Sequence, residues 1–117
     1  MSSLQQNKSF KGSLGDFIKK IKECNHYYDI QDDKITERLV RYYITQSIIP
    51  RPKRDGKEFF YLYDHLLKFL YARKQIIDGW PLTKLKEMMK FEENQYFEDF
   101  FKSNFKTDNT VDSMSLI

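Results

Sequence analysis

Groups that usually carry catalysis or hold metal ions are scarce in this sequence. It has one cysteine, Cys24, and two histidines, His26 and His65, among 117 residues. Cys24 and His26 lie two positions apart, but two ligands from one chain do not close a metal site. No glycine-rich phosphate loop, paired Cys/His spacing or Gly-x-Ser-x-Gly turn is present. We therefore expect no enzymatic activity, no cofactor and no bound metal.

Long apolar runs are missing as well. No segment has the length and hydrophobicity that cross a bilayer, and residues 1–12 lack the basic and then apolar pattern of a signal peptide. A single cysteine is typical of a reducing compartment, since small secreted domains usually carry paired cysteines. We expect a cytoplasmic protein without a membrane partner, whose length suits one small core.

What the sequence does contain is a short amphipathic helix at residues 36–45. On a 3.6-residue period, Leu39, Val40 and Tyr43 share one face. The opposite face carries Arg38, Arg41, Tyr42 and Thr45. Thr36 is expected to cap the helix, and Glu37 follows it. Two interpretations fit this segment: an ordinary amphipathic helix with a solvated basic face, or a helix that reads DNA.

A basic β-hairpin is predicted directly after this helix, at residues 50–61. Asp55-Gly56 lies in its middle, and apolar or aromatic residues lie on both arms. Four basic residues surround the turn: Arg51, Lys53, Arg54 and Lys57. No core could use these side chains, but they could reach along a DNA backbone.

The charge of the chain is concentrated in the same region. The net charge is +3, yet residues 34–90 carry thirteen basic and six acidic side chains, whereas residues 91–117 carry two basic and six acidic ones. A positive field over the helix and hairpin would attract a polyanion. The alternative is a chance fluctuation in a lysine-rich protein.

The helix and hairpin together resemble the winged helix-turn-helix domain of MerR-type transcription regulators. The family's pattern Ser/Thr-x-Arg-Thr-Ile-Arg-Tyr-Tyr, with its Gly-Leu-Leu-Pro-like exit, is similar to Thr36, Arg38, Val40, Arg41, Tyr42, Tyr43, Ile48, Ile49 and Pro50. After the hairpin, Tyr61, Leu66 and the run 79–85 resemble the family's next two helices. Two departures are clear: the hairpin lacks the family's usual arginine after its turn, and the connection at residues 25–34 is longer than usual.

The resemblance implies a mainly α fold, a winged helix-turn-helix with a small hairpin wing and a short C-terminal helix. We expect a flexible segment at 1–12, the DNA-binding domain at 13–90, an aromatic helix at 91–106 and a polar tail at 107–117. The aromatic helix carries a stripe at helical spacing, formed by Phe97, Phe100, Phe101 and Phe105. We favour a two-fold dimer interface for this stripe, and the alternative is that it caps the core of its own chain.

The expected function is sequence-specific binding of double-stranded DNA by a homodimeric transcription regulator associated with the nucleoid. The candidate DNA-binding residues are Thr36, Glu37, Arg38, Arg41, Tyr42, Thr45, Arg51, Lys53, Arg54 and Lys57. Repression is expected, because no small-molecule effector domain is evident. Two alternatives stay open: an excisionase-like factor that bends DNA for a mobile element, and a protein-interaction adaptor that uses the aromatic stripe.

Overall fold

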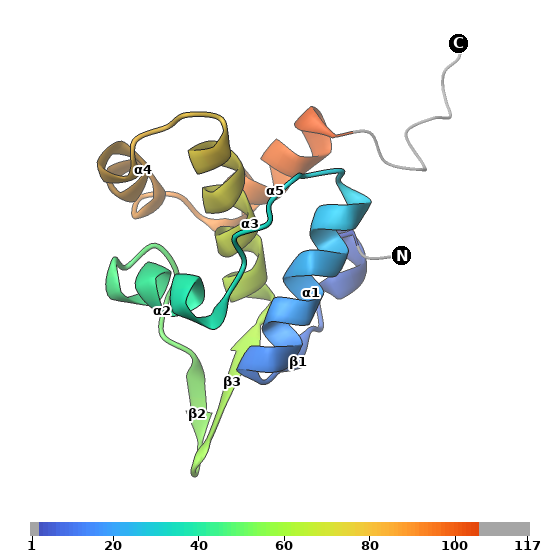
Figure 1. Ribbon diagram of the computed structural model, residues 1–117, viewed down its shortest axis with the longest axis vertical. Helices are drawn as coiled ribbons and strands as arrows, with labels where there is room; N and C mark the ends of the chain where they lie inside the picture. Colours follow the sequence, from blue (N-terminus) through green and yellow to red (C-terminus); the bar gives the residue numbers. More distant parts are fainter. Residues whose placement is uncertain (1–2, 106–117) are drawn as a thin grey trace.

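Five α-helices and a small antiparallel sheet form the part of the chain that the computed structural model describes, residues 3–105 (Figure 1). In chain order the elements are a 3₁₀ turn at Gln5–Asn7, β1 at Lys11–Gly12, α1 at Leu14–Tyr27, α2 at Glu37–Thr45, β2 at Lys53–Asp55, β3 at Glu58–Leu62, α3 at Tyr63–Ile77, α4 at Leu82–Met89 and α5 at Asn94–Asn104. The expectation of a mainly α chain with one β-hairpin is confirmed. The expected tail at 107–117 lies outside the described residues.

The starts of α1 and α2 follow from local side-chain chemistry. The Asp16 N–H donates to the Ser13 hydroxyl and the Ser13 N–H donates to the Asp16 carboxylate, so the first turn of α1 has a complete capping box. The Leu39 N–H donates to the hydroxyl of Thr36 at 3.1 Å, which confirms Thr36 as the cap of α2.

The ends of α1, α2 and α3 share one backbone arrangement. The chain enters the left-handed region at Asp29, Ser47 and Gly79, with φ of 57°, 62° and 100°. The following residue then donates its N–H to a carbonyl five positions back, in the pairs Ile30 to Asn25, Ile48 to Tyr43 and Trp80 to Gln75. This Schellman arrangement satisfies carbonyls that would otherwise be unpaired. Gly79 therefore ends α3 as its sequence position predicts.

The sheet has the strand order β1-β3-β2, with both pairs antiparallel. Asp55 pairs with Glu58, so Gly56 and Lys57 form the two-residue turn. The predicted centre of the turn, Asp55-Gly56, is therefore wrong by one residue. Gly56 has a φ of 64°, which suits the first position of a type II′ turn, where glycine carries no steric cost.

The expectation of a flexible segment at residues 1–12 is also wrong for the part described. Lys11 and Gly12 pair with Leu62 and Tyr61 of β3, which adds a third strand. Leu4 is buried in the core, and its N–H donates to the Tyr28 hydroxyl at 2.9 Å. Backbone pairing and the buried Leu4 hold this segment in place. Neither feature could be predicted from the polar composition of the segment.

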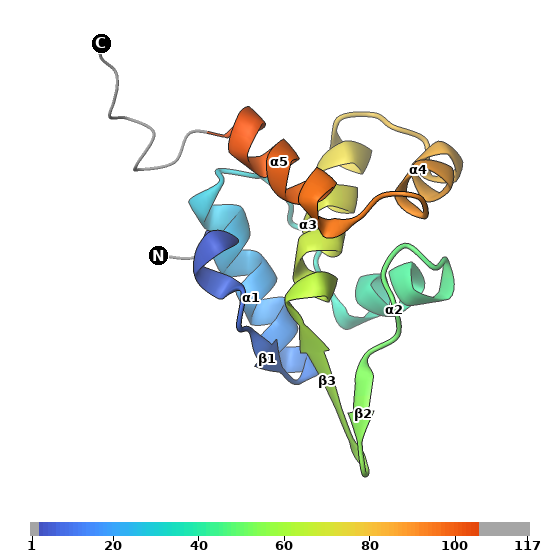
Figure 2. The same cartoon turned by 180° about the vertical axis from the view of Figure 1, so that it is seen from behind.

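Helix α3 runs through the middle of the fold and is buried on most sides (Figures 1 and 2). Phe17 of α1 stacks on Tyr61 of β3, with ring centroids 4.6 Å apart, and meets Phe69 of α3 edge-on. Tyr43 of α2 packs on the same Phe69 at 5.1 Å. The core therefore joins α1, α2, β3 and α3 through aromatic contacts.

The aromatic stripe of α5 packs against the chain's own core. Phe97 and Phe101 are 0% and 3% exposed. Phe97 lies 4.8 Å from Tyr71 of α3, and Phe101 lies 5.0 Å from Tyr28, both measured between ring centroids. Figure 2 shows α5 lying across α3 beside α1. This placement corrects the preference for a dimer interface at Phe97 and Phe101, because both rings are already covered within one copy.

The long connection between α1 and α2 is anchored by a buried ion pair. Arg73 of α3 donates to both carboxylate oxygens of Asp32, at 2.7 and 2.9 Å, and also to the Tyr43 hydroxyl at 3.1 Å. Both charged side chains are almost fully buried. Burial raises the pKa of the Tyr43 hydroxyl, and the hydrogen bonds to Asp32 raise the pKa of Arg73, so the guanidinium stays protonated. Arg73 thereby links the connection to α2, whose orientation the sequence left undefined.

Candidate nucleic-acid interface

Helix α2 presents the polar face that the sequence predicted. Val40 and Tyr43 are buried, and Leu39 is partly buried against the core. The opposite face is exposed along its length, at Arg38, Arg41, Tyr42 and Thr45. Thr36 and Glu37 are also exposed, at the first turn. The free N–H groups and positive end of the dipole at this turn favour an anion.

Three of the exposed side chains on α2 already have partners within the helix. Arg41 lies 3.3 Å from the Glu37 carboxylate, and both side chains are more than half exposed. An exposed pair of this kind contributes at most about 1 kcal/mol, so a phosphate can compete for Arg41. The Thr45 hydroxyl donates to the Arg41 carbonyl at 3.0 Å, which leaves its methyl group and lone pairs for an external contact.

The β2–β3 hairpin has two faces of different character. Strand alternation and the observed register place Arg54, Phe59 and Tyr61 on one face. Tyr61 turns this face toward the core, where it stacks on Phe17. The other face carries Lys53, Asp55, Glu58 and Phe60. The predicted contact residue Lys53 therefore lies among carboxylates, on the face away from Arg54.

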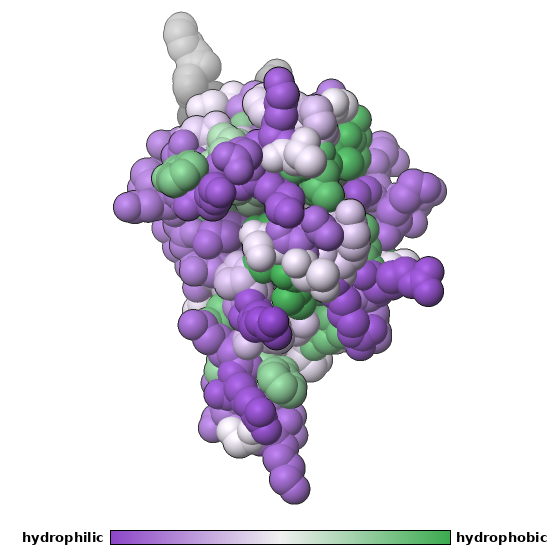
Figure 3. Space-filling view, turned by 90° about the vertical axis from the view of Figure 1, so that its left-hand side faces the viewer, coloured by the Kyte–Doolittle hydropathy of each residue, from purple (hydrophilic) through white to green (hydrophobic). Residues whose placement is uncertain are grey.

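The face with Arg54 is the one directed toward α2. Burial raises the pKa of the Tyr61 hydroxyl, and the charges of Arg41 and Glu37 on α2 act on that same hydroxyl. The base of the hairpin and the first turns of α2 are thus close in space. Figure 3 shows this side of the molecule, with the hairpin projecting at the bottom and hydrophilic atoms covering much of the surface. Arg41 and the base of the hairpin at Tyr61 therefore lie on the same side of the molecule.

The hairpin is attached to α3 through His65. The Leu62 N–H donates to Nδ1 of His65 at 2.9 Å, so Nε2 carries the proton and donates to the Arg51 carbonyl at 3.0 Å. Burial lowers the pKa of His65, which keeps the ring neutral. One imidazole therefore fixes both the segment that leads into β2 and the end of β3.

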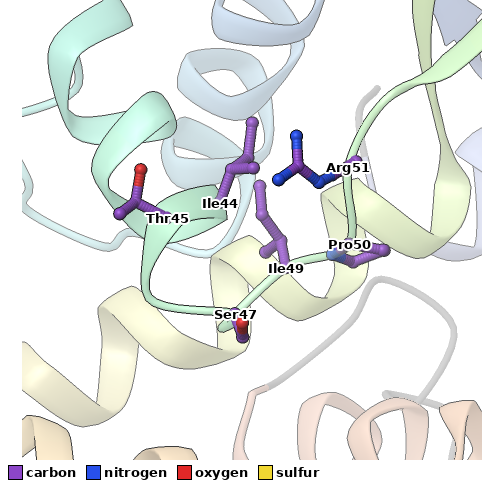
Figure 4. Close-up of a pocket in the computed structure, with 6 residues that line it drawn as sticks. All are labelled: Ile44, Thr45, Ser47, Ile49, Pro50 and Arg51. Carbon is purple, nitrogen blue, oxygen red and sulfur yellow. The ribbon is translucent and has the colours of Figure 1, made fainter.

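A half-open hollow lies between the end of α2 and the start of the hairpin. Its volume is about 330 Å³. The lining residues are Ile44, Thr45, Ser47, Ile49, Pro50 and Arg51. Figure 4 shows the Arg51 guanidinium and the Ile44 and Ile49 side chains directed into the same space. The hollow combines apolar walls with one cation, and none of its lining residues is acidic.

Most of the residues predicted from sequence fall on one side of the molecule. Arg38, Arg41, Tyr42, Arg51 and Arg54 border the α2 side, and Lys57 lies at the hairpin turn. Sequence reasoning missed the pairing of Phe59 with Arg54 and the contacts of His65 and Arg73. A turn centred on Asp55-Gly56 would pair Arg54 with Lys57 instead of Phe59. No sequence signal pairs Arg73 with Asp32, which lies 41 positions away.

Among residues 3–105, no three His, Cys, Asp or Glu side chains come together as a metal-binding group. None of the helices described there has both the length and the apolar character that a bilayer crossing needs. Burial raises the pKa of Cys24 to about 12, so this thiol is protonated at neutral pH.

Comparison with known proteins gives no assignment. No known protein family, no curated protein and no solved structure matches the chain.

Proposed function

We propose that the protein binds double-stranded DNA through the exposed face of α2 and the adjoining face of the β2–β3 hairpin. The observation that carries the proposal is the exposed row of Arg38, Arg41, Tyr42 and Thr45 on a helix whose other face is buried. An α-helix fits the major groove of B-DNA, and arginine is the side chain that most often reads guanine there. Arg54 of β2 and Lys57 of the β2–β3 turn add two cations from the hairpin to this proposed surface.

The residues divide into those that read bases and those that bind phosphates. Arg38 projects from the first turn of α2, next to the free N–H groups, and is assigned to a base edge. Glu37 can accept a hydrogen bond from cytosine, and the Thr45 methyl can contact thymine. Arg41 and Tyr42 of α2, together with Arg51, Arg54 and Lys57 of the hairpin region, are exposed and are assigned to the phosphate backbone. Lys53 is left out of the proposed interface.

The resemblance to MerR-type regulators extends the proposal to a winged helix-turn-helix that acts as a transcription regulator, with repression as its expected effect. In this interpretation α1 supports α2 as the first helix of the motif, and the hairpin is the wing. A homodimer would suit a palindromic operator. Since Phe97 and Phe101 are buried within one copy, its interface would have to use other surface.

The adaptor alternative loses its main support, because the aromatic stripe on which it depends is largely covered. An excisionase-like factor would fill tandem DNA sites, whereas a dimeric regulator would bind a palindrome. The symmetry of the preferred DNA site therefore distinguishes the two functions, and the best test is a method that reveals this symmetry.

Selection of preferred duplexes from a random pool provides that test. We expect recovery of a short motif, with paired inverted copies if the protein acts as a dimer. Tandem copies filled cooperatively would favour the excisionase-like alternative. A pool that shows no enrichment, together with equal binding to heparin, would contradict sequence-specific DNA binding.

A further inference from the structure

We propose that Phe59 is a positioning residue for DNA binding: its ring holds the Arg54 guanidinium on the α2-facing side of the hairpin, oriented to bind a phosphate. The inference rests on the proposed DNA-binding function and adds to it a residue that contacts the arginine rather than the DNA.

The two side chains are paired by the register of the hairpin. Arg54 and Phe59 lie directly opposite each other on β2 and β3. The guanidinium carbon of Arg54 lies 5.4 Å from the centroid of the Phe59 ring, within the range of a cation–π contact. Arginine stacks on aromatic faces more readily than lysine, because its guanidinium is planar.

A backbone hydrogen bond fixes the same guanidinium from a second side. Nε of Arg54 donates to the Gly56 carbonyl at 2.8 Å, at the turn of the hairpin. Both the ring and the carbonyl leave the terminal nitrogens of Arg54 unused by any hydrogen bond among residues 3–105. A guanidinium held in this way loses less side-chain entropy when it binds the oxygens of a phosphate.

Phe59 has no comparable role in the core. Its side chain is 53% exposed, and it is not one of the residues that pack in or against the hydrophobic core. Isolated exposed aromatic residues are common on protein surfaces, so the exposure of Phe59 alone does not indicate a function. The guanidinium stacked on the ring is the observation that gives Phe59 a specific partner.

The opposite face of the hairpin provides an internal comparison. There, Nζ of Lys11 lies 4.3 Å from the centroid of the Phe60 ring. Phe60 shares its face with Asp55 and Glu58, whose carboxylates repel a phosphate. The two neighbouring phenylalanines thus each hold a cation, but only Phe59 holds one on the face without carboxylates.

A direct role for the ring is the competing explanation. Some DNA-binding proteins insert an apolar side chain between base pairs. Insertion of Phe59 would require the ring to leave the guanidinium. A double-mutant cycle distinguishes the two explanations, because positioning acts only through Arg54.

The experiment measures dissociation constants for a random-sequence duplex at several salt concentrations. The variants are Phe59→Leu, Arg54→Ala, the double variant and the matched control Phe60→Leu. We expect Arg54→Ala to reduce the salt slope by about 0.9, which is the loss of one phosphate contact. Phe59→Leu should weaken binding about two- to five-fold, as expected for a lost cation–π contact, and should add nothing when Arg54 is already alanine. Phe60→Leu should bind like the wild type.

Equal losses from Phe59→Leu in the presence and absence of Arg54 would overturn the proposal, as would wild-type affinity of Phe59→Leu. Failure of the wild-type protein to bind any duplex would instead contradict the proposed function itself. A second measurement needs no DNA: ¹⁵N relaxation of the Arg54 Nε should show an ordered side chain that becomes mobile in Phe59→Leu. An Arg54 Nε in the wild type as mobile as that of the exposed Arg38 would overturn the positioning role.

Discussion

Arg38 lies one residue beyond the first position of α2, exposed and next to the free N–H groups of the helix start. Because this position points a guanidinium away from the core, we assign it to a base edge. Arg38→Ala should weaken binding to the preferred duplex by about 1–3 kcal/mol more than binding to random DNA, the usual discrimination of a bidentate arginine–guanine contact. Titration of both duplexes measures the difference. Lys102→Ala, an exposed change on α5, is the control, and equal losses on both duplexes would make Arg38 a phosphate contact.

Asp32 is linked to α2 through the buried guanidinium of Arg73. Its carboxylate accepts two hydrogen bonds from Arg73, and Arg73 also holds the Tyr43 hydroxyl. Asp32→Ala leaves a buried guanidinium without its counter-charge, so the free energy of unfolding should fall by about 3–5 kcal/mol. Denaturant unfolding measures this, with the exposed neighbour change Asp33→Ala as the control. A loss no larger than that of the control would show that the ion pair does not stabilise the fold.

At the scale of elements, the attachment of the hairpin to α3 should depend on pH through His65. Burial lowers the pKa of His65 in the folded protein, while the unfolded chain has the ordinary value of about 6.5. The unfolded state therefore binds more protons once the pH falls below that value. The contribution of His65 is fully present above pH 6.5 and is lost progressively as the pH falls below it.

The prediction concerns the slope of stability against pH in this window. We expect the free energy of unfolding to decrease from about pH 7 to pH 5, and we expect His65→Gln to reduce this slope, because glutamine accepts and donates at similar positions without titrating. His26→Gln, a change at an exposed histidine of α1, is the matched control. Equal slopes in the wild type and His65→Gln would remove His65 as the cause.

At the scale of the whole molecule, α5 completes the core of its own chain. Phe101 is 3% exposed and packs between Tyr28 and Phe105. Phe101→Asp would bury an unpaired carboxylate, which costs several kcal/mol, so we expect unfolding or a large loss of stability rather than simple dissociation of a dimer. Circular dichroism and sedimentation measure the two outcomes. The exposed change Asp99→Asn is the control, and a folded, monomeric Phe101→Asp beside a dimeric wild type would support the dimer interface instead.

Features of the fold that depend on neighbouring residues could be predicted from the sequence, whereas contacts between distant residues could not. The cap at Thr36, the buried face of α2, the end of α3 at Gly79 and the hairpin after Pro50 depend on neighbouring residues and were predictable. The pairing of β1 with β3 and the burial of Phe97 depend on residues far apart in sequence and were not. Helical periodicity shows that the aromatic stripe of α5 must be buried, but it does not show whether the chain's own core or a second copy buries it. For this reason the sequence could not exclude a dimer interface.

The same distinction applies to the candidate site. Helical spacing identified Arg38, Arg41, Tyr42 and Thr45 as one face, since that pattern is a property of the helix alone. Strand alternation places the neighbours Lys53 and Arg54 on opposite faces of the hairpin. Which of the two faces turns toward the core depends on the packing of Tyr61 against Phe17, two residues far apart in sequence, and for this reason Lys53 could not be excluded beforehand.

The central claim, that the exposed face of α2 and the Arg54 side of the hairpin bind double-stranded DNA, is tested most directly by titrating a duplex into ¹⁵N-labelled protein. We expect the amide signals of α2 and of the hairpin to shift with increasing DNA, while those of the exposed side of α5 stay unchanged. The shifts should weaken as salt is added, because phosphate contacts release counterions. Shifts confined to α5, or none at low salt, would contradict the account.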